Sequence, residues 1–365
     1  MAKGILAILG SGETAPNMVK VYRQFLQPLG EVSGVLLDTP FGFQENIPQL
    51  TAKIVDYFKI SLLTDVTPAT FTSFEQSTAL ERTQFIATIE RSNFVFAGPG
   101  SPTYAMKQWG PLNLGSALLS VLDRGGVVCF SSAAALTLGR CTAPIYELYK
   151  VGEAPHWVAG LDLLSAYGLN CAVIPHFDNA EGGNHDTRFC YLGERRLTLL
   201  ESMLDNTTAT FGVDEHTAAV FDLNKDTVTV LGRGHAYWRT GSEHRQLSKG
   251  EAVPLDELRN TVGTTRAQGT KTSVVRSTAQ QLAESVLHGG GDSTAALAEL
   301  VALAASGGPG RIDPTPLVDG ILRVRTDARS LGQYQLADEL RDALLAAGID
   351  VQDTAGGGQW SLREP

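Results

Sequence analysis

The chain has 365 residues, of which 43% are hydrophobic and 19% are charged. A chain of this length exceeds the usual size of one domain and has ample apolar mass for a core, so we expect two units. The formal net charge of −10 counts against a nucleic-acid partner, because phosphate binding usually shows as an excess of basic residues.

The cysteines and the apolar segments indicate the cellular compartment in which we expect the protein. No apolar stretch reaches the length of a membrane span, and the apolar run at residues 4–10 is too short for a signal-peptide core. The four cysteines have no C-x-x-C spacing and are Cys129, Cys141, Cys171 and Cys190. We therefore expect reduced thiols in a cytoplasmic protein without a membrane partner.

Short apolar runs alternate with helical patterns over the first two-thirds of the chain. The expected strands cover residues 5–9, 32–37, 94–97, 127–130 and 172–174. The expected helices between them cover residues 17–25, 47–58, 74–90 and 114–123. This alternation predicts an α/β fold with a mostly parallel sheet covered by helices on both faces. Residues 218–223 and 227–231 flank a polar turn and predict a hairpin at the edge of that sheet.

Chemically suited residues follow directly after the expected strands. Gly10-Ser11-Gly12 follows the first strand, residues 98–102 follow the third, Ser131-Ser132 the fourth, and His176 the fifth. Since the carboxyl ends of parallel strands meet at one edge, we expect these residues to gather there. The turn at Gly10 lacks the rest of a dinucleotide fingerprint, so we interpret it as a tight turn and expect no cofactor.

The strand at residues 127–130 runs into two serines, and three alanines then begin a helix. A strand that turns at a serine into a helix is how many hydrolases hold a nucleophile, because the turn exposes the hydroxyl beside free N–H groups. Ser132 is therefore the expected nucleophile. The usual motif has glycines on both sides, whereas Phe130 and Ala134 stand here. The alternative is a buried strand followed by a helix start capped by Ser131.

Acyl transfer by serine also needs a base and an acid that orients the base. His176 is the expected base, because it follows a strand at the same edge as Ser132. A histidine bonded only to backbone is the alternative. Glu147 is the expected orienting acid. The weaker candidates for these two roles are His156 and His185 as bases, and Asp178 and Glu181 as acids.

The remaining site residues would bind the substrate. We expect backbone N–H groups of the turn Gly98–Gly100 and the N–H of Ala133 to stabilise an oxyanion. Ser101, next in the same turn, is expected to contact the substrate. Arg188, on an expected helix, could clamp a substrate carboxylate with two hydrogen bonds; the alternative is an ion pair with Asp186.

A metal site is not expected near Arg188. His185 and Asp186 are adjacent, but no second histidine stands at ligand spacing.

The character of the chain changes near residue 241. Gly-rich breaks at residues 288–293 and 306–310 are typical of linkers, with a helix expected at 274–287. Helical patterns then cover residues 316–331 and 334–347, and a strand, a turn and a strand follow to residue 362. We predict an α/β domain at 1–245, a linker with one or two helices at 246–312, and a helical hairpin with terminal strands at 313–365.

Several motifs, in the same order along the chain, resemble the cyanophycinase and dipeptidase E family of serine peptidases. They are Phe130-Ser131-Ser132-Ala133-Ala134-Ala135, Pro175-His176-Phe177, Thr187-Arg188 and residues 212–218. The resemblance covers residues 3–238 and implies a three-layer, class I glutamine amidotransferase-like fold. It implies Ser132 as nucleophile, His176 as base and Gly100 in the oxyanion loop. It also implies hydrolysis beside aspartate, in short peptides or in an aspartate–arginine polymer.

The last fifty or so residues resemble the C-terminal end of cysteinyl-tRNA synthetases. The motifs lie at residues 321–329, 336–342 and 348–360. The nucleotide-binding signatures and zinc-ligand cysteines of the synthetases are missing, so aminoacylation is excluded. From Asp313 onward nine Asp and Glu stand against five Arg, which argues against autonomous tRNA binding.

These observations predict a serine-type hydrolase that cleaves amide bonds in small peptides. The alternative is a catalytically inactive ligand-binding or translation-associated adaptor on the same fold. A tRNA or translation-factor partner and the association of two copies are left open.

Overall fold

The computed structural model describes residues 3–241, 243–264, 334–346, 349–354 and 357–362, and five single residues between 318 and 329. The chain divides into two compact units, Met1–Thr264 and Thr265–Pro365.

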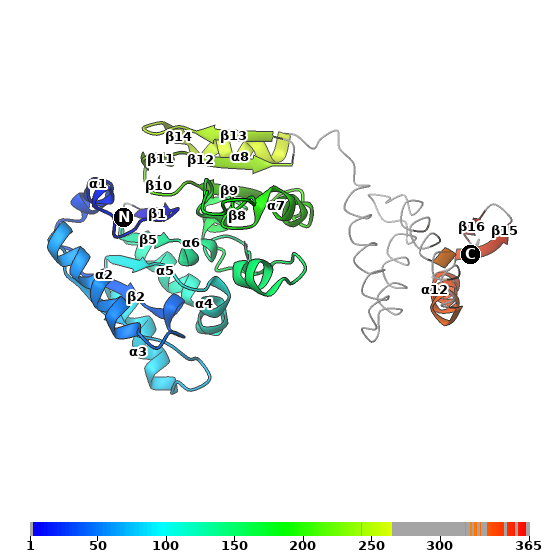
Figure 1. The fold of residues 1–365 in the computed structure, drawn as a ribbon, viewed down its shortest axis with the longest axis horizontal. Coiled ribbons are helices and arrows are strands. Elements are labelled where there is room, and N and C mark those ends of the chain that lie inside the picture. Colours follow the sequence, from blue (N-terminus) through cyan, green and yellow to red (C-terminus); the bar gives the residue numbers. More distant parts are fainter. Residues whose placement is uncertain are drawn as a thin grey trace. The chain divides into compact units, whose positions relative to one another are not determined.

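An eight-stranded sheet lies at the centre of the first unit (Figure 1), in the order β14-β11-β10-β1-β5-β4-β2-β3. Its strands are β1 (Ile5–Leu9), β2 (Gly34–Leu37), β3 (Val66–Ala69), β4 (Phe94–Ala97), β5 (Val127–Ser131), β10 (Thr217–Asp222), β11 (Thr227–Gly232) and β14 (Ala252–Pro254). The five strands from β1 to β3 in this order pair in parallel. The hairpin β10–β11 and β14 add antiparallel strands at the other edge. The expected mostly parallel sheet is confirmed.

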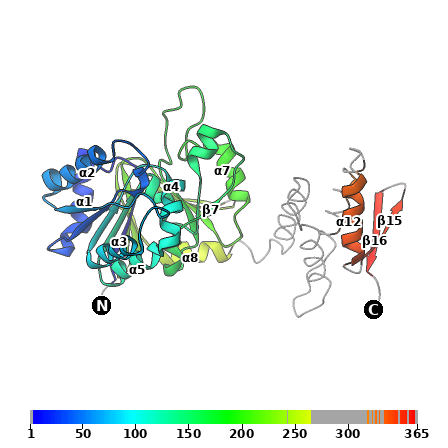
Figure 2. The same cartoon turned by 90° about the horizontal axis from the view of Figure 1, so that it is seen from below.

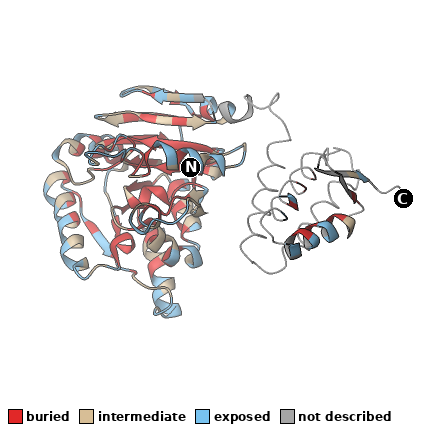
Figure 3. Ribbon diagram, turned by 45° about the vertical axis from the view of Figure 1, so that its right-hand side comes forward, coloured by how far each residue is buried: buried red, intermediate tan, exposed pale blue. Residues whose placement is uncertain are grey.

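Helices cover both faces of this sheet, as Figure 2 shows. They are α1 (Val19–Leu26) and α2 (Ile47–Leu62) on one face, and α3 (Ala79–Arg91), α4 (Pro102–Trp109) and α5 (Leu114–Asp123) on the other. In β1, Leu6 and Ile8 pack towards α3–α5, whereas Ala7 and Leu9 pack towards α1 and α2. Because both faces of β1, β2, β4 and β5 are buried (Figure 3), these strands are apolar without alternation, whereas β11 alternates. Full burial of each large side chain contributes about 1.5–3 kcal/mol.

A second sheet carries part of the candidate site. Its strands, in the order β13-β12-β9-β8, are β8 (Cys171–Ile174), β9 (Ala209–Val213), β12 (Ala236–Thr240) and β13 (Glu243–Leu247). Residues 172–174 therefore do not join the central sheet, which corrects our expectation. Helix α7 (Gly193–Ser202) packs Leu197 and Leu200 against the side of this sheet that carries Ile174. The two-residue strands β6 (Cys141–Thr142) and β7 (Val158–Ala159) pair separately.

Residues 246–264 belong to the first unit instead of starting a linker. They complete β13 and form β14, which pairs with β11, and helix α8 (Leu255–Thr264). Arg259 of α8 forms an ion pair with Asp226 at 2.6 Å, and Leu255 and Leu258 are buried. These apolar positions explain why the segment packs against the domain.

The described part of the second unit contains α12 (Tyr334–Ala346) and the antiparallel pair β15 (Ile349–Thr354) and β16 (Gly357–Leu362). The expected second helix and the strand, turn and strand are confirmed. Of the expected helix at 316–331, the five described residues are helical, and the expected helix at 274–287 lies outside the described residues. Among the helices that the structure describes, none is both long and apolar enough to cross a membrane.

Candidate active site

Ser132 lies at a strained turn between β5 and the short helix α6 (Ala133–Leu136). Its backbone angles are φ 52° and ψ −122°, a region that residues with a side chain rarely adopt. Ser132 N donates to the carbonyl of Leu9 at 3.2 Å, which fixes the turn against β1. Such a conformation costs about 1–3 kcal/mol and is found most often at active sites and ligand clamps.

His176 faces this serine. The distance between Ser132 Oγ and His176 Nε2 is 2.8 Å, which is a hydrogen bond. The backbone of His176 is held on both sides, because its N–H donates to the carbonyl of Gly10 at 3.2 Å and its carbonyl accepts from Cys190 N at 3.1 Å. The structure thus brings together the two residues that the sequence placed at one edge.

Glu215 lies on the other side of the imidazole. Its Oε1 is 2.7 Å from His176 Nδ1, and the same oxygen accepts a hydrogen bond from Asn179 Nδ2 at 3.2 Å. Glu215 N donates to Asp178 Oδ1 at 2.7 Å. The hydrogen bond from His176 is the main reason why the pKa of Glu215 lies below its ordinary value. Glu215 is therefore ionised at neutral pH.

Glu147, the expected orienting acid, lies elsewhere. It is in a π-helical turn, Glu147–Val151, where its carboxylate accepts a hydrogen bond from Thr103 Oγ1 at 3.0 Å. Glu215 has the position beside His176 that we expected for Glu147. His176 follows β8 and Glu215 follows β9, and the two strands are parallel neighbours, so the residues after them lie close together. The sequence held one signal, because Glu215 lies in the motif at residues 212–218 noted above.

The other titratable candidates support or surround this arrangement. Asp178 accepts from the backbone of Glu215, and the carboxylate of Glu181 binds the Tyr191 hydroxyl. His185 stacks on Tyr149 with 6.2 Å between the ring centroids. His156 Nδ1 lies 3.0 Å from the carbonyl of Ala154.

The loop after β4 lies beside the turn that carries Ser132, which we call the elbow. Ala134 N donates to the carbonyl of Gly98 at 3.2 Å. Gly100 has φ 142°, and a Cβ there would lie 2.0 Å from the carbonyl oxygen of Pro40, so only glycine fits. Within the described part of the chain, neither Gly100 N nor Ala133 N donates a hydrogen bond. Both N–H groups are therefore available to a ligand.

Arg188 and Ser101 have local partners. Arg188 binds the Asp186 carboxylate through Nε and Nη2, both at 2.9 Å, which is the alternative that the sequence left open. Arg188 precedes α7 and is not part of a helix. Ser101 Oγ accepts from Tyr104 N at 3.1 Å and caps the start of α4.

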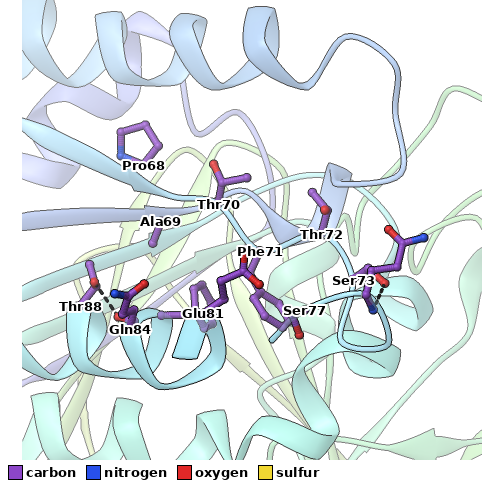
Figure 4. Close-up of a pocket in the computed structure, with 12 residues that line it drawn as sticks. Pro68, Ala69, Thr70, Phe71, Thr72, Ser73, Ser77, Glu81, Gln84 and Thr88 are labelled. Atoms are coloured by element: carbon purple, nitrogen blue, oxygen red, sulfur yellow. Dashed lines mark hydrogen bonds between the residues drawn. The ribbon is translucent and has the colours of Figure 1, made fainter. Parts of the chain in front are cut away.

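A hollow of about 360 Å³ at the edge strand β3 is separate from this arrangement. Figure 4 shows its walls, which come from β3, from the segment after it and from α3, and include Thr70, Phe71, Ser77, Glu81 and Gln84. None of the expected site residues lines it.

The histidine, acidic and cysteine side chains of the described residues form neither a metal-binding group nor a disulfide. Within the described residues, no group of three or more His, Cys, Asp or Glu is arranged to hold a metal ion. All four cysteines are free. Burial raises the pKa of the Cys141 thiol to about 12.

No family model matches the chain. The crystal structure of a peptidase from an acI-B1 Actinobacterium is similar to it, with a TM-score of 0.56 and 19% identity over 69% of this chain and 97% of that one. At this identity the likeness shows the fold. The first unit thus combines the α/β fold of a solved peptidase with a serine–histidine–glutamate arrangement at the ends of its strands.

The C-terminal region is similar to another class of protein. A cysteine–tRNA ligase of Dehalococcoides mccartyi is 45% identical over 51 residues, which are 14% of this chain and 11% of the ligase. The ligase of Haloarcula marismortui is 50% identical over 46 residues, 13% of this chain and 9% of the ligase. The chain thus spans about a tenth of the length of these relatives.

Proposed function

We propose that the protein is a serine peptidase that hydrolyses amide bonds in small peptides, with Ser132 as nucleophile. The observation that carries this proposal is the unbroken series of hydrogen bonds from Ser132 Oγ to His176 at 2.8 Å and from His176 to Glu215 at 2.7 Å. A serine, a base and an orienting acid in this order are what acyl transfer requires.

The geometry supports the following steps. Ser132 Oγ attacks the substrate carbonyl while its proton passes to His176 Nε2, and Glu215 stabilises the imidazolium. The N–H groups of Gly100 and Ala133 bind the oxyanion. Each such donor is worth about 10²–10³ in rate. His176 then protonates the leaving amine, and water hydrolyses the acyl-enzyme by the reverse path.

Cleavage beside aspartate is a finer hypothesis, which comes from the resemblance to the cyanophycinase and dipeptidase E family. It needs a cation for the substrate carboxylate. Arg188 already binds Asp186 through two hydrogen bonds, so a substrate would have to replace that partner. The geometry of Arg188 alone therefore does not favour this specificity.

Labelling with a fluorophosphonate tests the proposed nucleophile. The wild-type protein should be labelled, and Ser132→Ala should lose the label completely. Ser131→Ala is the matched control, because Ser131 is buried and its hydroxyl bonds Glu13; this variant should keep the label. Labelling that persists in Ser132→Ala would refute the assignment.

A translation-associated role for the second unit is a second candidate, favoured by its similarity to cysteine–tRNA ligases over 51 residues. A gel-shift assay with tRNA tests it. Binding by the full chain that is lost when residues after Gly310 are removed, and kept when the sheet domain is removed, would support this role. The absence of any shift would count against it.

A further inference from the structure

A cavity of about 260 Å³ opens beside the proposed oxyanion loop. Its walls come from the turn after β1, from the segment after β2, from α2 and from the loop after β4. They include Glu13, Phe41, Leu50, Ile54, Pro99 and Gly100.

Two contacts join this cavity to the elbow that carries Ser132. Glu13 accepts a hydrogen bond from the hydroxyl of Ser131, the residue before Ser132, at 2.9 Å. Gly100 lies two residues after Gly98, and the carbonyl of Gly98 accepts a hydrogen bond from the N–H of Ala134. Since β1 and β4 are the two neighbours of β5, the loops after them flank Ser132 on both sides. Gly100 therefore belongs both to the walls of the cavity and to the loop beside Ser132.

The walls favour an uncharged, apolar group. Phe41 and Ile54 are buried hydrophobic residues, and Leu50 and Pro99 add aliphatic surface between them. Glu13 is the one acid on these walls, and its carboxylate lies on the side of Ser131. A negatively charged substrate group in the cavity would therefore be repelled.

The cation on these walls does not reverse this preference. Among the described residues that line the cavity, Lys53 is the single cation, and it is an exposed residue of α2. Solvent screens an exposed charge strongly, so Lys53 offers little to a carboxylate inside the cavity.

We propose that this cavity binds the side chain of the residue that supplies the scissile carbonyl, and that it prefers an uncharged aliphatic side chain of the size of leucine. This inference rests on the proposed serine mechanism, because it places the carbonyl at Gly100. It makes the protein a peptidase for bonds that follow an aliphatic residue.

Diphenyl esters of 1-aminoalkylphosphonates test the subsite and the nucleophile together. Ser132 Oγ forms a bond to phosphorus, one phenoxide leaves, and the serine proton passes through His176 to give phenol. We expect the second-order labelling constant of the leucine-like ester to exceed that of the alanine-like ester by about tenfold or more. The aspartate-like ester should react no faster than the alanine-like one.

Two variants of α2 test whether the preference for the leucine-like ester arises in this cavity. Leu50→Trp should fill the cavity and reduce the leucine-like constant to the alanine-like value, with little change for alanine. Ile60→Trp is the matched control, because Ile60 is on the same helix, is 74% exposed and does not line the cavity. It should keep the full preference.

The outcomes separate the two proposals. Equal constants for the three esters in a labelled wild-type protein, or a faster aspartate-like ester, would overturn the subsite and leave the serine mechanism standing. No labelling by any ester or by a fluorophosphonate would overturn both. Because the comparison of esters in the wild-type protein needs no variant, misfolding of Leu50→Trp does not affect this decision.

Discussion

The carboxylate of Glu215 holds the imidazole of His176 by a 2.7 Å hydrogen bond to Nδ1. This bond fixes the imidazole tautomer in which Nε2 can accept the Ser132 proton. Loss of the bond should therefore slow the chemical step and leave substrate binding unchanged. We expect Glu215→Gln to lower kcat about 10²–10⁴-fold with little change in KM, by analogy with the triads of known serine proteases. Peptide hydrolysis, measured over pH 5–9, tests this.

Glu147→Gln is the matched control for that experiment. Its carboxylate binds Thr103, so the substitution should leave kcat within a few-fold of the wild-type value. If Glu147→Gln were the more damaging of the two, the role that we give to Glu215 would be wrong.

Asp214, the neighbour of Glu215, links the site to the pH dependence of stability. Burial raises the pKa of Asp214 from 3.8 to about 6. The folded state therefore holds this proton more tightly than the unfolded state, and the free energy of unfolding should fall as pH rises through 6. Asp214→Asn removes this dependence and should raise stability at pH 7 by about 1–2 kcal/mol, with little effect near pH 4.

Urea unfolding at the two pH values measures this effect, with Asp56→Asn on the exposed side of α2 as control. The backbone N–H of His235 and the Tyr237 hydroxyl donate to Asp214 Oδ2, and asparagine keeps an oxygen for both. A variant that is less stable than the wild type at pH 7 would show that the charged form is favoured.

Sequence reasoning placed Ser132 and His176 at one edge, where they share a hydrogen bond, but it did not place Glu215 there, for a physical reason. The first two residues follow short apolar runs that end at small or polar residues. Glu215 follows a less apolar run that contains Thr210 and Gly212, and it is one of many acids in the chain. Only the parallel pairing of β8 with β9 shows that it meets His176. Which distant strands pair with each other cannot be predicted from the local sequence.

At the scale of elements, the junction of β5 and α6 stores backbone strain that one substitution should release. Ser132 has φ 52° and ψ −122°, angles that glycine adopts at no steric cost. We expect Ser132→Gly to be more stable than Ser132→Ala by about 1 kcal/mol, because alanine keeps the strain. Thermal and urea unfolding of the two inactive variants tests this.

Ser131 provides the matched pair of substitutions. It is the last residue of β5 and has extended backbone, where glycine only adds freedom to the unfolded chain. Ser131→Gly should therefore be less stable than Ser131→Ala by about 0.5–1 kcal/mol. The same order at both positions would mean that the elbow is not strained.

The inner strands β1, β2, β4 and β5 could be predicted one by one, because they are buried on both faces and therefore continuously apolar. The elements that the sequence did not predict are those without this continuous apolar pattern. β3 has exposed Thr67 and Pro68 in its middle, and α4 follows a proline-containing turn that resembles a loop. Residues 172–174 have the apolar signature of the central sheet, but the signature cannot say which of two sheets a strand joins.

At the scale of the whole molecule, the proposed site and its cavity are formed by residues of the first unit, Met1–Thr264. All three residues of the hydrogen-bonded series lie before Thr217, and so do the cavity walls. The second unit is thus not needed for the chemistry that we propose.

A pair of truncations tests where the first unit ends. A chain that stops after Thr264 should fold and should react with the fluorophosphonate within about twofold of the full-length rate. A chain that stops at residue 245, the boundary expected from the sequence, loses β14, α8 and part of β13, with the buried side chains of Val253, Leu255 and Leu258. At about 1.5–3 kcal/mol for each side chain, this loss is comparable to the whole stability of a typical domain, about 5–15 kcal/mol. The shorter chain should therefore be largely unfolded by circular dichroism; equal stability of the two chains would place the end of the unit at the earlier boundary.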